Sequence, residues 1–307
     1  MSEVGISISP EQLAPLEGGI ELAYQTFGDP TDEPLLLVMG LAGHLTWWDD
    51  DLCRLLAHAG FFVIRFDNRD IGRSTRLTHE HPTRRMLVKA FLGRKVRVPY
   101  SMQDLAEDAA GLLDHLGLPA AHVVGISMGG MIAQTLALAH PKRVLSLTSI
   151  MSTTGRRTVG WQDPKLLPRL LKPAPRDVEE YVAMNRAFWL LIGSPQYPLG
   201  DDYFTARARQ TWARGTNPAG VMRQMLAVLT QPDRTHELRS LTMPALVIHG
   251  LQDRMVHVSG GRATARAIPG AELLLVQGMG HDLPTELFPH FVEAIRRVAD
   301  RNGADQG

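Results

Sequence analysis

Short apolar runs alternate with helical patterns along most of the chain. A continuous apolar run, typical of a strand buried on both faces, lies at residues 35–39. Further strand patterns lie at residues 61–66, 122–126, 144–150, 244–250 and 271–276, and residues 20–27 alternate as a half-exposed strand does. Helical patterns cover residues 50–58, 101–116, 131–138, 259–268 and 284–298. Strands that alternate with helices predict an α/β fold, with a mostly parallel sheet and helices on both faces.

The pattern changes between residues 155 and 238. Strand patterns stop there, and prolines separate helical runs such as residues 177–191 and 219–229. We therefore expect residues 1–154 and 239–307 to form a core domain, and residues 155–238 to form a helical cap (lid) inserted between two strands. Large aromatic side chains of this insertion would pack within the cap or, in one or two cases, face a pocket; they are Trp161, Tyr181, Phe188, Trp189, Tyr203, Phe204 and Trp212.

Basic side chains mark the connection at residues 76–97. Apolar residues lie between them, so the segment is either a solvated surface element or a short amphipathic lid helix near a binding site. The basic residues are Arg76, Arg84, Arg85, Lys89, Arg94, Lys95 and Arg97.

Composition narrows the class of protein. The 307 residues suit one large domain or a domain with an insertion. The 32 acidic and 32 basic residues balance, so global charge favours neither nucleic acid nor an anionic membrane as a partner. Cys53 is the only cysteine, which excludes an intrachain disulfide and disfavours a cysteine-based metal site. With neither a secretory signal pattern nor a run of about 20 apolar residues, we expect no integral membrane segment and a cytoplasmic protein. The sequence leaves a homodimer open.

Ser127 is the candidate nucleophile. It lies in Gly125-Ile126-Ser127-Met128-Gly129, between an apolar strand pattern and a helical pattern. A serine on such a sharp strand-to-helix turn leaves no room for a Cβ two positions away, and Gly125 and Gly129 provide that room. The alternative is a glycine-rich turn that only joins a strand to a helix.

Asp253 and His281 are the candidate acid and base. Each lies in a loop directly after a predicted strand, and the carboxyl ends of parallel strands meet at one edge of a sheet. A serine hydroxyl needs a base, and the base needs an orienting carboxylate. Asp282 adjoins His281 and would not easily reach the ring from the required side. The stretch after Ile150 contains no carboxylate that could replace Asp253.

Other polar residues near the predicted site have supporting roles. His44 lies in the loop after Met39 and suits the wall of the site or support of that loop. The loop that contains Asp67 and Asp70 would brace the site through hydrogen bonds to neighbouring backbone. The N–H of Met128 and that of Leu41 would form the oxyanion hole, because Gly40 lets the backbone approach closely. This chemistry needs no metal or organic cofactor.

These motifs resemble the α/β-hydrolase superfamily over residues 35–298, with the cap as the variable part. The resemblance rests on residues 125–130, 67–74, 250–253 and 278–281. It implies an eight-stranded type of sheet and the chain order Ser, Asp, His. Residues 38–40, 67–74 and 278–281 are also similar to bacterial carboxylesterases of the aclacinomycin methylesterase kind. Two departures, Met39 before Gly40 and Asp70 in the polar loop, leave the substrate class open.

The motifs predict a serine hydrolase of carboxylic esters that forms an acyl-enzyme. A hydrolase of lactones, thioesters or C–C bonds and a cofactor-free perhydrolase would keep the same serine. Haloalkane dehalogenases and epoxide hydrolases use an aspartate nucleophile, so Ser127 argues against both. A hydrolase-like receptor that binds a small molecule without turnover is the alternative from another class.

Overall fold

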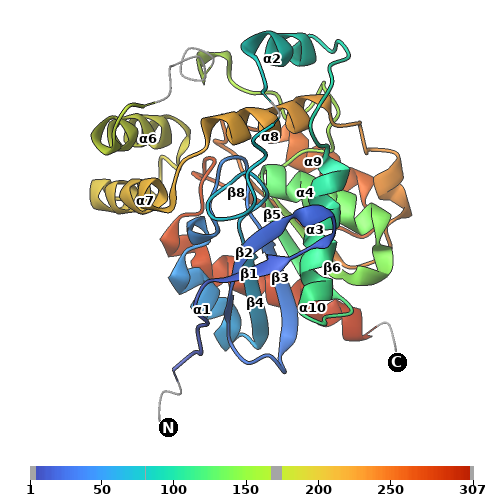
Figure 1. Ribbon diagram of the computed structural model, residues 1–307. Helices are drawn as coiled ribbons and strands as arrows, with labels where there is room; N and C mark the ends of the chain where they lie inside the picture. Colours follow the sequence, from blue (N-terminus) through green and yellow to red (C-terminus); the bar gives the residue numbers. More distant parts are fainter. Residues whose placement is uncertain (1–4, 80, 167–174, 305–307) are drawn as a thin grey trace.

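An eight-stranded sheet forms the centre of the protein in the computed structural model, which describes residues 5–79, 81–166 and 175–304 (Figure 1). The strand order is β1-β2-β4-β3-β5-β6-β7-β8. The pairs β1–β2 and β2–β4 are antiparallel and the others are parallel, which confirms the predicted fold class. The strands are β1 (Gln12–Pro15), β2 (Glu21–Phe27), β3 (Glu33–Val38), β4 (Phe61–Phe66), β5 (Ala121–Ile126), β6 (Val144–Ile150), β7 (Ala245–Gly250) and β8 (Glu272–Val276). The prediction missed β1, a four-residue edge strand that contains a proline.

Helices cover both faces of the sheet and bury its alternating side chains. On one face Leu36 and Val38 of β3 pack with α3 (Met102–His115) and α4 (Met128–Ala139). On the other face Leu35 and Leu37 pack with α1 (Asp50–His58) and α10 (Phe288–Ala304). The helix α9 (Ser259–Ala267) contacts β7 and β8. This layering holds the strand ends in fixed positions.

Helix boundaries follow local chemistry. The predicted serine cap of α3 is present as a capping box, in which Ser101 and Asp104 satisfy each other's backbone N–H groups. The helix α10, predicted to begin at residue 284, starts instead at Phe288: Pro284 has extended backbone, and a 3₁₀ turn (Thr285–Leu287) separates it from the α-helix. It continues to Ala304, beyond the predicted end at residue 298.

Three α-helices lie between β6 and β7 in the described part of residues 155–238. They are α6 (Val178–Ile192), α7 (Asp201–Arg214) and α8 (Pro218–Thr230), and no strand occurs in this described part. Figure 1 shows α6 and α7 side by side, with α8 crossing one end of the sheet. The prediction did not single out α7, whose sequence is mostly polar. Residues 167–174, within the range predicted as the cap, lie outside the described residues.

The basic segment contains one helix, α2 (Arg84–Phe91), which packs against α8 (Figure 1). Val88, Phe91 and Leu92 are more than half exposed, so α2 is a surface element; whether it moves as a lid stays a prediction. Within the described ranges, no helix is long and apolar enough to cross a membrane.

Candidate active site

Ser127 lies on a strained turn between β5 and α4. Its φ of 55° and ψ of −118° are rare for a residue with a side chain. A Cβ at Gly125 would collide with the Gly129 carbonyl, and a Cβ at Gly129 would collide with the Val38 carbonyl. The two glycines therefore allow the tight packing that the sequence pattern predicts, and the turn leaves Ser127 partly accessible.

Ser127, His281 and Asp253 form one hydrogen-bonded chain. Ser127 Oγ lies 3.1 Å from His281 Nε2, and His281 Nδ1 lies 2.7 Å from Asp253 Oδ2. The three side chains follow β5, β8 and β7, whose carboxyl ends lie at one edge of the sheet. The fold thus brings together the three residues that the sequence selects, at distances suited to transfer of a proton from serine to imidazole.

The carboxylate of Asp253 is buried and accepts several hydrogen bonds. Its Oδ1 accepts the N–H groups of Met255 and Val256, each at 2.8 Å, and its Oδ2 lies 3.4 Å from His249 Nε2. Burial by itself raises the pKa of Asp253, but the charge of His281 and hydrogen bonds from His249 and His281 outweigh it and lower the pKa to about 2. The carboxylate is therefore ionised at neutral pH and orients the His281 ring.

Asp282 has different partners from Asp253. Its carboxylate accepts hydrogen bonds from the N–H and the hydroxyl of Ser194, which follows α6. The side chain is thus engaged away from the His281 ring, in agreement with the choice of Asp253.

The two predicted oxyanion-hole donors, the N–H groups of Leu41 and Met128, belong to segments that lie beside Ser127. Met128 is the first residue of α4, and a Cβ at Gly40 would lie only 3.2 Å from the Ser127 Cβ, so the loop after β3 runs beside the serine. Within residues 5–79, 81–166 and 175–304, the N–H groups of Leu41 and Met128 donate no hydrogen bond.

Sequence reasoning missed Gln224 of α8, which accepts a hydrogen bond from the Ala42 N–H; no spacing pattern marks this residue.

The carboxylates of Asp67 and Asp70, in the loop after β4, accept hydrogen bonds from neighbouring backbone, as predicted. Asp67 accepts the N–H groups of Leu45 and Arg73 at 2.6 and 3.0 Å, and Asp70 accepts that of Leu77 at 2.9 Å. Each carboxylate also pairs with an arginine from a helix between β6 and β7, which the sequence did not reveal. Arg214 binds Asp67, and Arg223 binds Asp70.

His44, in the loop after β3, is buried. Its exposed fraction is 3%, and within the described residues its Nδ1 has no hydrogen-bond partner. Burial, followed by the charges of Arg214 and Arg76, lowers the pKa of His44 to about 3. The ring is therefore neutral at physiological pH, which suits the supporting role expected for it.

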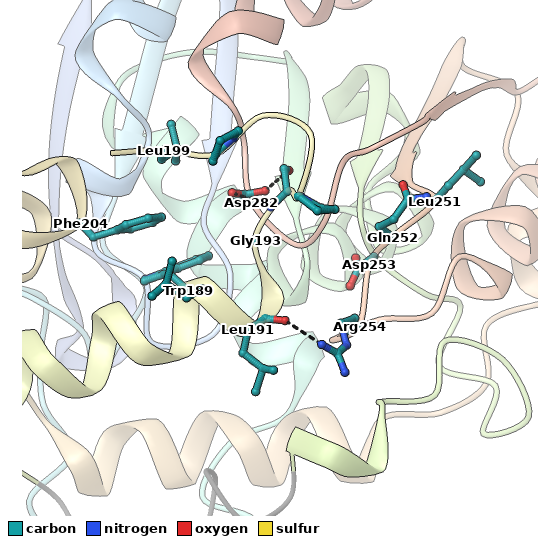
Figure 2. A pocket seen from close by; sticks show the side chains of 14 residues that line it. Trp189, Leu191, Gly193, Leu199, Phe204, Leu251, Gln252, Asp253, Arg254 and Asp282 are labelled. Carbon is teal, nitrogen blue, oxygen red and sulfur yellow. Dashed lines mark hydrogen bonds between the residues drawn. The ribbon is translucent and has the colours of Figure 1, made fainter. Parts of the chain in front are cut away.

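A cavity of about 560 Å³ borders Asp253 (Figure 2). Asp253 and Asp282 form part of its wall, whereas Ser127 and His281 do not line it. Trp189, Leu199 and Phe204 from the insertion supply much of the apolar lining. The cavity therefore borders the site without containing the serine.

The described residues include no group of three or more His, Cys, Asp or Glu side chains that could hold a metal ion. Cys53 is buried, and burial raises the pKa of its thiol to about 12, which makes it a poor nucleophile.

Known proteins match this chain over most of its length. It is 32% identical to rhodomycin D methylesterase DauP of a Streptomyces species, over 300 residues that cover 90% of this chain and 94% of that protein. It is 31% identical to rhodomycin D methylesterase DnrP of Streptomyces peucetius, with the same coverage. The aclacinomycin methylesterase resemblance is thereby confirmed.

Solved structures support the fold. The enol-lactonase from Burkholderia xenovorans matches with a TM-score of 0.72 at 23% identity, covering 94% of this chain and all of that one. A putative aryl esterase from Burkholderia cenocepacia matches with a TM-score of 0.74 at 17% identity, covering 96% of this chain and all of that one. The family model described as the alpha/beta hydrolase fold matches residues 33–286. The chain therefore belongs to the alpha/beta hydrolase family.

Proposed function

We propose that this protein hydrolyses carboxylic esters, with Ser127 as nucleophile, His281 as general base and Asp253 as the orienting acid. The observation that carries the proposal is the continuous chain from Ser127 Oγ through His281 to Asp253, with contacts of 3.1 and 2.7 Å. The similarity to two methylesterases supports an ester as the substrate.

The reaction proceeds through an acyl-enzyme. Ser127 Oγ attacks the ester carbonyl while His281 Nε2 takes its proton, and the N–H groups of Leu41 and Met128 stabilise the oxyanion. The C–O bond to the alcohol breaks, and His281 returns the proton to the leaving oxygen. Water then attacks the acyl carbonyl, again with His281 as base, and releases the acid and free Ser127. Asp253 stabilises the imidazolium in both steps.

Residues 155–238 act as the cap over this site. Three contacts with the core support that role: Arg214 and Arg223 bind the loop after β4, and Trp47 packs edge-on against Trp189 with ring centroids 5.5 Å apart. The cap would select the substrate. Its aromatic side chains favour a bulky or apolar acyl or alcohol group, as in a methyl ester of a large acid.

The test is hydrolysis of p-nitrophenyl acetate and butyrate by Ser127→Ala beside the parent enzyme. We expect a loss of at least 10³-fold in kcat/KM. Ser240→Ala, an exposed serine of the 3₁₀ turn Glu237–Ser240, serves as a matched control and keeps full activity. Ser127→Ala activity within tenfold of the parent would contradict the mechanism.

A graded panel then separates the remaining chemistries. Methyl esters of large acids, lactones, thioesters and peracid formation are compared by kcat/KM. Turnover no faster than buffer, together with tight binding of a small molecule, would favour a receptor. The cytoplasmic location and the homodimer stay predictions; light scattering after size-exclusion chromatography tests the second.

A further inference from the structure

The turn that carries His281 is bound to the end of α6 and to the chain segment that follows it. The His281 N–H donates to the Ile192 carbonyl at 2.7 Å, and the Gly280 N–H donates to the Ser194 hydroxyl oxygen at 2.9 Å. The Ser194 hydroxyl in turn donates to Asp282 Oδ1, and the Ser194 N–H donates to Asp282 Oδ2 at 3.2 Å. Three consecutive residues, Gly280 to Asp282, are thus each hydrogen-bonded to the insertion.

Ser194 and Asp282 are buried, so the loss of a hydrogen bond between them would be costly. Ser194 and Asp282 are each 4% exposed. Burial raises the pKa of Asp282, while the hydrogen bonds from Ser194 act in the opposite direction. A buried carboxylate that loses its partners is costly, so the pair is strongly held together. The backbones also approach closely, because a Cβ at Gly280 would collide with the Gly193 carbonyl.

A cavity borders part of this segment. Gly193, Ser194, Pro195 and Asp282 line the cavity of about 560 Å³ (Figure 2). Where the cavity leaves no packed neighbours, the hydrogen bonds to the His281 turn restrain the segment.

We propose that Ser194 and Asp282 are positioning residues for His281. The pair clamps the turn so that Nε2 stays within reach of Ser127 and Nδ1 within reach of Asp253. This proposal rests on the proposed function. If the pair acts in this way, His281 is correctly placed only when the segment after α6 makes its hydrogen bonds to the core.

The test compares Ser194→Ala, Asp282→Ala and the double variant with the parent enzyme, per folded protein as judged by circular dichroism melting. We expect each single variant to lower kcat about 10- to 100-fold with KM changed less than twofold, because a misplaced base weakens only the transition state. The double variant should lose no more than the worse single variant, because both remove the same clamp. Asp282→Asn should stay within threefold of the parent, since its amide can donate to the Ser194 hydroxyl oxygen and accept the Ser194 N–H.

Two further variants complete the design. Thr235→Ala removes another hydrogen bond between insertion and core, to Thr154 at 2.9 Å, and should keep kcat. Ser194→Cys fills the same space with a weak donor and acceptor, so it tests the clamp even if the alanine variants do not fold. We expect it to lower kcat at least fivefold.

A readout without substrate separates this proposal from the proposed function. The low-field proton resonance of the His281 Nδ1–H should be present in the parent and broadened in Ser194→Ala or Ser194→Cys. Unchanged kcat and an unchanged resonance in these variants, or losses that multiply in the double variant, would overturn the clamp. Full activity of Ser127→Ala would instead overturn the proposed function.

Discussion

Gln224 of α8 accepts a hydrogen bond from the main-chain N–H of Ala42, at 3.0 Å. Ala42 has a φ of 62°, and it directly follows Leu41 in the loop beside Ser127. The same side chain donates to the Arg69 carbonyl at 3.2 Å and is fully buried. A helix of the insertion thus holds two loops of the core, including the one that supplies a proposed oxyanion donor.

Replacing Gln224 should weaken catalysis more than substrate binding. In Gln224→Leu the Ala42 N–H loses its acceptor and the Leu41 N–H can shift, so we expect kcat to fall about 10- to 100-fold with little change in KM. Gln103→Leu, on the exposed first turn of α3, is the control. Steady-state kinetics on p-nitrophenyl butyrate tests this prediction. An unchanged kcat would show that Gln224 does not position the Leu41 N–H.

Asp253→Asn should leave a folded but nearly inactive enzyme. An amide at the Oδ2 position would point a donor at His281 Nδ1–H and favour the wrong tautomer, so we expect kcat to fall by about 10³ to 10⁴. Asp300→Asn, on the exposed side of α10, should behave as the parent. If Asp253→Asn keeps more than a tenth of the parent kcat, another group orients His281.

Gly129→Ala and Gly111→Ala separate steric collision from helix propensity. Both glycines lie in helices, but a Cβ at Gly129 would collide with the Val38 carbonyl, whereas one at Gly111 would make ordinary contact with Leu16 at 3.4 Å. We expect Gly129→Ala to lower the free energy of unfolding by about 1–3 kcal/mol and to displace Ser127. Gly111→Ala should raise it by about 0.5–1 kcal/mol. Urea unfolding measures both, and equal effects would refute the steric argument.

The buried ion pair between Arg223 and Asp70 should stabilise the protein because both partners are present. Arg223 Nε and Nη2 each lie 2.7 Å from the Asp70 carboxylate, which also accepts the Tyr100 hydroxyl at 2.9 Å. Arg223→Ala leaves a buried carboxylate without its charge partner, so we expect a loss of about 3–5 kcal/mol in the free energy of unfolding. Arg176→Ala breaks an exposed pair with Glu180 and should leave the urea midpoint unchanged. Equal midpoints for the two variants would contradict the prediction.

His44 should make the protein less stable as the pH falls. The folded-state pKa of His44 is lowered to about 3, so between pH 6.5 and that value the unfolded chain binds a proton that the folded protein does not. Stability from this residue is thus present above pH 6.5 and is lost as pH falls, by about 2 kcal/mol between pH 6.5 and 5. Urea unfolding measures the free energy of unfolding at both pH values. Between them, His44→Gln should lose less of this free energy than the parent, by the same amount. Equal pH dependence in the two proteins would show that His44 does not titrate in this way.

The strand and helix pattern was predictable because it depends on local chemistry. Buried parallel strands consist mostly of apolar residues, and the strand patterns at residues 61–66 and 144–150 match β4 and β6 residue for residue. The short edge strand β1 and the polar helix α7 were missed, because neither has a strong apolar pattern. The start of α10 differs from the prediction because Pro284 has extended backbone and the next three residues form a 3₁₀ turn.

By itself the sequence determined the family, the sheet with helices on both faces, and the choice of Ser127, Asp253 and His281. These follow from short motifs and from the rule that parallel strands place their carboxyl ends at one edge. Only the tertiary structure decided which distant side chains hold that site in place. Ser194 with Asp282, Gln224 with Ala42 and Arg223 with Asp70 are contacts across 88, 182 and 153 residues of chain. No local pattern encodes such pairs, because each depends on how the insertion packs on the core.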